Sequence, residues 1–185
     1  MSTTVTRLTL ISHGMTAAMR SARFPVDEPL DEPHRGTASP AVPRADRVVA
    51  APELRATATA TLLSLRATTE PALRDLDCGD WAGRPMDTLA PADLMAWMTN
   101  PAYRGHGGEA LIDLLDRVRD WLGTVVADRR RIVAITHPAV VRASVLLALA
   151  APPESFWRID IPPLSATTLH SRGPAWTVRH TANPL

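Results

Sequence analysis

The sequence predicts an α/β fold, a three-layer α/β/α sandwich whose central sheet is mostly parallel. Three short apolar segments have the composition of buried strands: residues 5–11, 47–51 and 132–136. Each is followed by a segment with the features of a helix, such as a proline at its first turn or an apolar stripe. Strands that alternate with helices in this way favour a parallel sheet covered on both faces.

The length of 185 residues suits one domain with a core of ordinary size. No internal repeat, linker or boundary interrupts the pattern, so we expect a single domain over residues 1–185. Aromatic residues make up only 4% of the chain. The core is therefore expected to rest on Ala, Leu, Val and Ile.

Four main helices are expected, over residues 52–66, 87–98, 109–128 and 138–149. In the first, one face carries an apolar set at near-helical spacing: Leu54, Ala58, Leu62 and Leu65. In the second, the apolar set is Leu89, Leu94, Trp97 and Met98. The third is strongly amphipathic, and its inward face is predicted to hold Leu111, Leu114, Leu115, Val118, Leu122 and Val125.

The remaining segments are a loop and two strands. Residues 24–44 contain five prolines and form a long irregular loop, and loops of this length are often functional. Near the C-terminus, residues 165–169 and 175–179 alternate in polarity and suggest two edge strands.

The composition excludes several classes of protein. A formal net charge of +1 gives no basic field for nucleic acid. The single cysteine, Cys78, rules out an internal disulfide or a cysteine metal cluster. No apolar stretch approaches the roughly 20 residues of a membrane span, and the N-terminus lacks the pattern of a signal peptide. We therefore expect a cytoplasmic protein.

Two predicted strands end directly in histidine. His13 follows the first strand, His137 follows the third, and Arg55 lies in the first turn of the helix after the second strand. In parallel sheets the ligand site lies beyond the carboxyl ends of the strands. These three side chains are thus expected to converge, although they are far apart in the sequence.

Five segments in order carry a family pattern. The first reads Ser12-His13-Gly14-Met15-Thr16 where the family has Arg-His-Gly-x-Thr. The others are residues 51–60, 73–83, 107–109 and 135–142. Together they cover nearly the whole chain and resemble the histidine phosphatase (phosphoglycerate mutase-like) superfamily. The resemblance implies the phosphoglycerate mutase-like version of the predicted fold.

That resemblance implies phosphoryl transfer from a small-molecule substrate through a phosphohistidine, with no metal and no cofactor. His13 would attack phosphorus, and Arg55 would hold the phosphate oxygens. His137, protonated beside the phosphate, would stabilise the developing charge. Asp75 would protonate the leaving oxygen and then activate water. The other expected substrate-binding positions are Ser12, Thr16, Met19, Pro138 and Glu109.

Several positions depart from the family pattern, and each departure removes a donor. Ser12 replaces an arginine, Met19 an asparagine, Ala58 a glutamine, and Pro138 a glycine whose N–H is lost. Losing one charge-assisted contact costs on the order of 1.5–3 kcal/mol. Three functional hypotheses follow from this poorer set of donors.

In the first, the chain is a phosphomonoesterase in which loop arginines replace the missing donor, with Arg20, Arg23 and Arg35 as candidates. In the second, His13, Asp75 and His137 perform acid–base chemistry on an ester, lactone or cyclisation substrate. In the third, the chain is an inactive binding module. Mutase activity is not expected, because the chain lacks extra loops to enclose a bisphosphate.

Two further expectations concern surfaces. The C-terminal segment carries the apolar residues Phe156, Trp157, Ile159 and Ile161, which are expected to form core or the interface of a possible homodimer. The histidines outside the motifs are expected at the surface or in loops, namely His34, His106, His170 and His180, with His106 a candidate for the pocket mouth.

Overall fold

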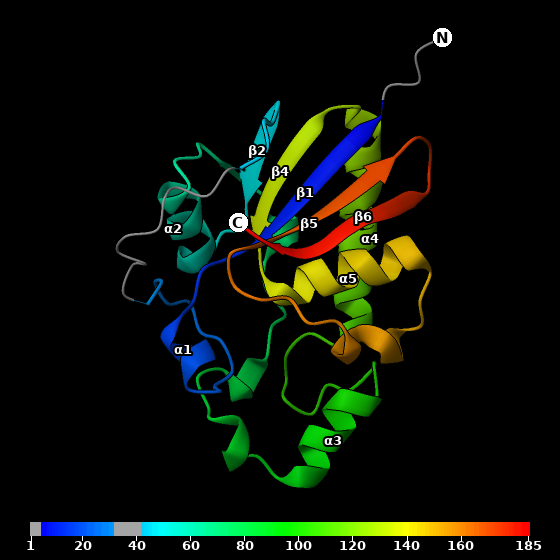
Figure 1. The fold of residues 1–185 in the computed structure, drawn as a ribbon. Helices are drawn as coiled ribbons and strands as arrows, with labels where there is room; N and C mark the ends of the chain where they lie inside the picture. Colours follow the sequence, from blue (N-terminus) through cyan, green and yellow to red (C-terminus); the bar gives the residue numbers. More distant parts are fainter. Residues whose placement is uncertain (1–4, 32–41) are drawn as a thin grey trace.

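The computed structural model describes residues 5–31 and 42–185, which form a six-stranded sheet in the order β3-β2-β4-β1-β5-β6 (Figure 1). The strands are β1 (Thr6–Ser12), β2 (Arg47–Ala50), β3 (Thr68–Thr69), β4 (Arg131–Thr136), β5 (Ser165–Ser171) and β6 (Trp176–Pro184). Strands β1 to β4 pair in parallel, whereas β5 pairs antiparallel with β1 and with β6. The sheet is therefore mixed but mostly parallel.

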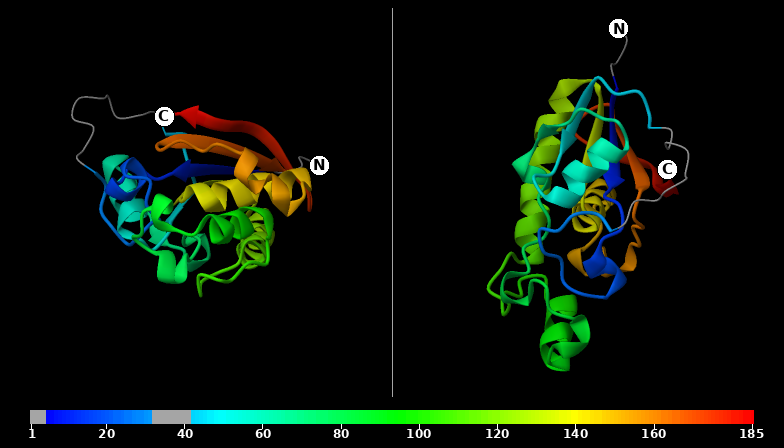
Figure 2. Two further views of the ribbon diagram at one scale, coloured as in Figure 1. Left: turned by 90° about the horizontal axis from the view of Figure 1, so that it is seen from below. Right: turned by 90° about the vertical axis from the view of Figure 1, so that its left-hand side faces the viewer.

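The helices are α1 (Ala17–Arg20), α2 (Leu54–Leu62), α3 (Pro91–Thr99), α4 (Leu111–Asp128) and α5 (Pro138–Leu149). Helices α4 and α5 contact each other and pack against β1, whereas α2 packs against β2 and β4. Figures 1 and 2 show α3 beyond the carboxyl ends of the parallel strands, away from the sheet. The predicted fold class, an α/β sandwich with a mostly parallel sheet flanked by helices, is confirmed.

The core lies between the central strands and α4. Leu8, Leu10 and Ile11 of β1 and the run from Ile132 to Ile135 of β4 are fully buried, as expected for inner parallel strands. All six residues predicted to face inward on α4 are buried, and Trp121 joins them. None of the described helices is long and apolar enough to cross a bilayer.

The predicted apolar face of α2 is wrong. Leu54 is 52% exposed and Leu62 also lies at the surface, whereas the buried residues are Arg55, Ala56, Thr59 and Ala60. The rotation of α2 about its own axis is set by Arg55, whose side chain must face the carboxyl end of the sheet. Small alanine side chains on the same face let the helix lie close to β2 and β4.

Other boundaries also differ from prediction. Residues 86–88 form a separate 3₁₀ turn, so α3 begins at Pro91, and Met98 on it is 45% exposed. Strand β5 is paired on both sides and is not an edge strand, while the two-residue β3 was not predicted. A two-residue strand gives too short an alternation to be recognised from the sequence.

The loop at residues 77–80 crosses close to the loop at residues 106–109. The Asp80 amide donates to the His106 carbonyl (2.8 Å), and the Glu109 amide donates to the Asp77 carbonyl (2.8 Å). A Cβ added at Gly108 would lie 2.2 Å from the Asp77 carbonyl oxygen and 2.7 Å from the Gly79 nitrogen. The crossing thus requires glycine at position 108.

Replacing Gly108 by alanine should lower the free energy of unfolding by about 1–3 kcal/mol, because the obstructing atoms are backbone. The matched control is Gly123→Ala in α4, where an added Cβ meets nothing within 4 Å. That control should raise the free energy by about 0.5–1 kcal/mol, as glycine weakens a helix interior. Denaturant unfolding measures both. Equal stability of the Gly108→Ala variant and the wild type would contradict the crossing.

Candidate active site

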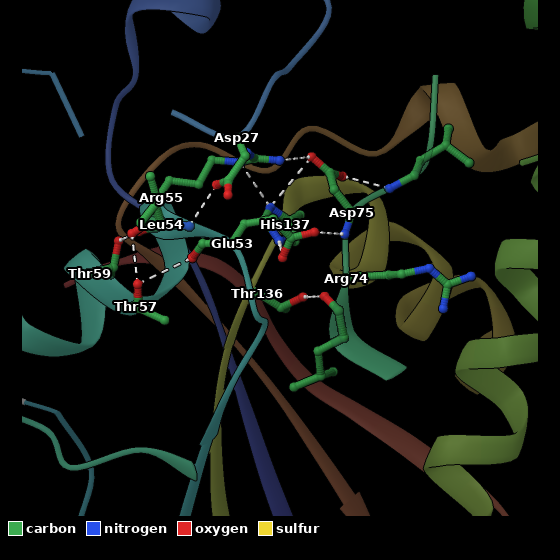
Figure 3. A network of polar contacts seen from close by, with 12 residues as sticks. Asp27, Glu53, Leu54, Arg55, Thr57, Thr59, Arg74, Asp75, Thr136 and His137 are labelled. Atoms are coloured by element: carbon green, nitrogen blue, oxygen red, sulfur yellow. Dashed lines mark hydrogen bonds and ion pairs between the residues drawn. The ribbon is translucent and has the colours of Figure 1, made fainter. Parts of the chain in front are cut away.

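Each parallel strand delivers a polar side chain to one edge of the sheet. His13 follows β1, Arg55 lies in the first turn of α2 after β2, and His137 follows β4. Asp75 follows β3 through a single 3₁₀ turn, residues 71–73. Figure 3 shows Arg55, Asp75 and His137 meeting although they come from separate elements. The predicted convergence of the two histidines and the arginine is therefore present in the fold.

Arg55 is the centre of this cluster and is almost fully buried. Its Nη2 donates to Asp75 Oδ2 (2.7 Å), its Nε to His137 Nδ1 (3.2 Å), and its Nη1 to the Val26 carbonyl (2.6 Å). A buried guanidinium needs such partners, because an unpaired buried charge is costly. Two of its five N–H groups are left for a ligand.

Asp75 is ionised in this arrangement. Burial alone would raise the pKa of its carboxyl group, but the interactions with His137 and with the Arg55 guanidinium outweigh burial and lower the pKa. The segment that carries it is fixed from two sides. Thr136 Oγ1 donates to the Leu73 carbonyl (2.8 Å), and the Asp75 amide donates to Glu53 Oε1 (2.9 Å).

His137 lies between a donor and an acceptor. Its Nδ1 faces the permanent donor Arg55 Nε, and its Nε2 lies 2.8 Å from Glu53 Oε2. Because a carboxylate can only accept, Nε2 carries a hydrogen that it donates to Glu53. Burial raises the pKa of Glu53, but the hydrogen bond from His137 and its charge outweigh burial and lower it. Glu53 is therefore a carboxylate that orients the ring.

His13 is held in the opposite tautomer. Its Nδ1 lies 2.7 Å from the Gly14 carbonyl, which can only accept, so Nδ1 carries the hydrogen and Nε2 has a free lone pair. Burial, followed by the charge of His137, lowers the pKa of His13 to about 4. The ring is thus neutral near pH 7. Thr59 fixes the turn by accepting from the Gly14 amide (2.9 Å).

A cavity of about 490 Å³ opens over this cluster. His13, Arg55 and Asp75 line one part of it, together with Met19 and Pro138. No group of three metal-ligating side chains with the geometry to hold a metal ion occurs among residues 5–31 and 42–185.

The other predicted binding positions have different surroundings. Ser12 is fully buried, and its Oγ has no hydrogen-bond partner within the described part of the chain. Thr16 is buried and accepts from the Met19 amide as the N-cap of α1. Arg23 lines the cavity, whereas Arg20 pairs with Asp31 and is largely exposed. Arg35 lies outside the described residues, as does His34.

Glu109 is not among the described residues that line the cavity. Its carboxylate is buried and pairs with Arg117 (2.7 Å) and Arg74 (3.2 Å). Arg117 in turn donates to the carbonyls of Ala72 (2.7 Å), Arg74 (3.0 Å) and Asp75 (3.4 Å). Glu109 therefore supports the site indirectly: it holds Arg117, which in turn holds the backbone at Asp75.

Two residues were missed or misplaced by the sequence analysis. Glu53 was not singled out, although an acidic residue stands there at a position where the motif is apolar, two residues before Arg55. His106 was expected at the surface or in a loop, as a candidate for the pocket mouth. It lies in a loop, but it is fully buried, packed edge-on against Trp81 and Tyr103, and is not among the described residues that line the cavity. Its Nδ1 accepts from the Gly108 amide (2.9 Å), which fixes the loop crossing.

Comparison with known proteins identifies the family. The model of the Histidine phosphatase superfamily (branch 1) matches residues 8–184. Since the match covers almost the whole sequence, the chain belongs to this superfamily.

A curated relative is the glucosyl-3-phosphoglycerate phosphatase of Mycolicibacterium vanbaalenii, 29% identical over 98 residues, which are 45% of this chain and 43% of that protein. The match spans less than half the length of this curated relative.

Solved structures share the fold over nearly the full length. The mycobacterial glucosyl-3-phosphoglycerate phosphatase in complex with VO3 has a TM-score of 0.81 at 24% identity, covering 96% of this chain and 98% of that one. A protein from Thermus thermophilus has a TM-score of 0.77 at 30% identity, covering 97% and 99%.

The two histidines should differ in tautomer. In long-range ¹H–¹⁵N correlation spectra at neutral pH, His13 should carry its hydrogen on Nδ1 and His137 on Nε2, because each faces a fixed partner there. Glu53→Leu should disturb the His137 resonances and leave the His13 tautomer unchanged. A hydrogen on Nε2 of His13 would contradict the proposed geometry.

The lowered pKa of His13 predicts a loss of stability in acid. Between about pH 6.5 and 4 the unfolded ring binds a proton that the folded ring does not, so stability falls as pH falls through this window. The full difference of the two pKa values corresponds to about 3 kcal/mol. Denaturant unfolding at several pH values should show this loss in wild type, and a smaller loss in His13→Ala. Equal losses in both would contradict the shift.

Proposed function

We propose that the chain is a phosphomonoesterase that transfers the phosphoryl group of a small phosphorylated metabolite to His13 and then to water. The observation that carries the proposal is the state of His13, a neutral imidazole whose Nε2 lone pair is free at the cavity. Family membership and the phosphatases among the similar proteins support it.

In the first half-reaction, Nε2 of His13 attacks phosphorus while the ester P–O bond breaks. The two remaining N–H groups of Arg55 hold phosphate oxygens. A phosphate oxygen that competes for Arg55 weakens its pairing with Asp75 and raises the pKa of that carboxyl group. Asp75 can then bind a proton in the complex and deliver it to the leaving oxygen.

In the second half-reaction, water attacks phosphorus and the P–N bond breaks. Asp75, now a carboxylate, accepts the proton of the attacking water, and His13 regains its lone pair. His137 donates its Nε2 hydrogen to Glu53, which fixes the orientation of the ring. Any charge that His137 gains is therefore balanced by that carboxylate.

Arg23 is the proposed substitute for the arginine missing at position 12. It lines the cavity and is exposed, so its guanidinium is free to turn toward a bound phosphate. Of the three arginines considered from the sequence, Arg20 is engaged with Asp31 and Arg35 lies outside the described residues. The phosphate would therefore lie between Arg55 and Arg23.

A second candidate function is acid–base chemistry on a substrate without phosphate. The observation that favours it is the balance of charge. Asp75 pairs with the buried Arg55 and Glu53 pairs with His137, while Ser12 offers a neutral hydroxyl with no partner among the described residues. In that chemistry Asp75 and His13 would move protons, and no phosphoenzyme would form.

Hydrolysis of simple phosphomonoesters tests the two functions. Wild type should hydrolyse them, and His13→Ala should lose activity by about 10³-fold or more, because it lacks the nucleophile. His180→Ala, which removes an exposed histidine of β6, is the matched control and should keep wild-type activity. Arg23→Ala should lose about 10- to 100-fold in kcat/KM, unlike the exposed control Arg66→Ala.

Ser12→Arg separates the two functions further. An inactive wild type with an active Ser12→Arg variant would contradict the phosphatase proposal and favour the acid–base alternative. Full activity in His13→Ala would exclude the phosphohistidine route.

A further inference from the structure

The cavity over the site has two unlike parts. One part carries the His13, Arg55 and Asp75 side chains, and the remainder is walled mainly by apolar side chains. Its main contributors come from α1 and its loop, from α3 and from the segment after α5: Met19, Phe24, Trp97, Phe156, Trp157 and Ile161. A ligand that reaches His13 therefore has most of its surface against hydrocarbon.

The aromatic wall is fixed by mutual packing. The rings of Trp97 and Trp157 have centroids 4.3 Å apart, and those of Phe156 and Trp157 are 4.8 Å apart. Phe24 packs edge-on against Trp97 at 5.4 Å. Phe24 and Phe156 are fully buried, so this wall is formed before a ligand binds.

Groups that recognise hydroxyls are scarce here. None of the described residues that line the cavity is Ser, Thr, Asn, Gln or Tyr. The neutral side-chain donors are the indoles of Trp97 and Trp157 and the thiol of Cys78, and that thiol already contacts the Leu76 carbonyl. Sugar hydroxyls enclosed by such walls lose water without gaining partners, which disfavours binding.

The charged residue Arg142 of the wall already has partners within the protein. Arg142 donates from Nε to the Ile159 carbonyl (2.7 Å), and its guanidinium lies 5.7 Å from the Phe156 ring centroid and 5.8 Å from that of Trp157. Asp160 lies near enough to act on its charge. Apart from this pair, the wall around Trp97 and Trp157 offers a ligand mainly apolar surface.

We infer that the substrate is the phosphomonoester of a bulky apolar alcohol, with an aromatic or fused-ring body, in contrast to a sugar or polyol phosphate. This inference rests on the proposed phosphatase function for the phosphate, but its evidence is the wall of the cavity. A volume of about 490 Å³ is in the range of pockets that enclose one drug-sized molecule. The phosphate binds at His13, and the ring body lies against Trp97 and Trp157, behind which the buried Phe156 packs.

The test compares primary alkyl phosphates, so that the leaving alcohols have similar reactivity. Wild type is assayed with 2-(2-naphthyl)ethyl phosphate, glycerol 3-phosphate and glucose 6-phosphate. The expected kcat/KM for the naphthyl compound is about 100-fold or more above both others, since burying a two-ring body is favourable here. Equal or better hydrolysis of either hydroxylated compound would overturn the inference and leave the phosphatase function standing.

Variants of the wall give a second readout. Trp157→Ala should lower kcat/KM for the naphthyl compound by about 10- to 100-fold, through KM, and change that for glycerol 3-phosphate little. Trp176→Ala removes a half-buried tryptophan of β6, far from the lining, and controls for general loss of packing. Equal effects of Trp157→Ala on both substrates would contradict the role of the wall.

A binding measurement distinguishes failure of the inferred apolar substrate class from failure of the proposed phosphatase function. Titration calorimetry with His13→Ala, which cannot form a phosphohistidine at that position, should show binding of the naphthyl compound and about 100-fold weaker binding of glucose 6-phosphate. Such selective binding with no hydrolysis by wild type would reject the phosphatase function and support the apolar ligand class. No selectivity in binding would overturn the inference whatever the activity.

Discussion

The site depends on the buried ion pair between Arg55 and Asp75. Its two members come from α2 and from the segment after β3, and both also contact His137 after β4. An ion pair so deep in a protein persists only when other groups satisfy its remaining donors and acceptors. Here the Val26 carbonyl and His137 Nδ1 accept two further hydrogen bonds from Arg55. The pairing therefore fixes three segments at the carboxyl edge of the sheet.

Two further carboxylates support His137 and Asp75. Glu53 accepts from His137 and from the Asp75 amide, and Glu109 holds the arginine that supports the backbone of Asp75. Each of these carboxylates has a partner in the protein, so both act by positioning other groups of the site.

The fold class and the convergence of His13, Arg55 and His137 could be predicted from the sequence, because strands that end in His13 and His137 and a helix that begins near Arg55 are local features. The inward face of α4 was also predictable, since its apolar spacing is unbroken over five turns. The face of α2 was not, because a buried arginine turned its leucines outward. Glu53 was missed because its partners lie 22 and 84 residues away.

The single-domain organisation, the possible homodimer and the roles of the site residues stay predictions. Phe156 and Ile161 are buried in the core.

Trapping the phosphoenzyme tests the central claim most directly. Asp75→Asn is mixed with an aryl phosphate, whose good leaving group needs no proton, and the quenched protein is digested and examined by mass spectrometry. The account predicts that phosphate accumulates on the peptide that contains His13, because the second half-reaction lacks its base, and that the adduct is lost in acid. Turnover by wild type with no phosphorylated His13 peptide in either protein would contradict it.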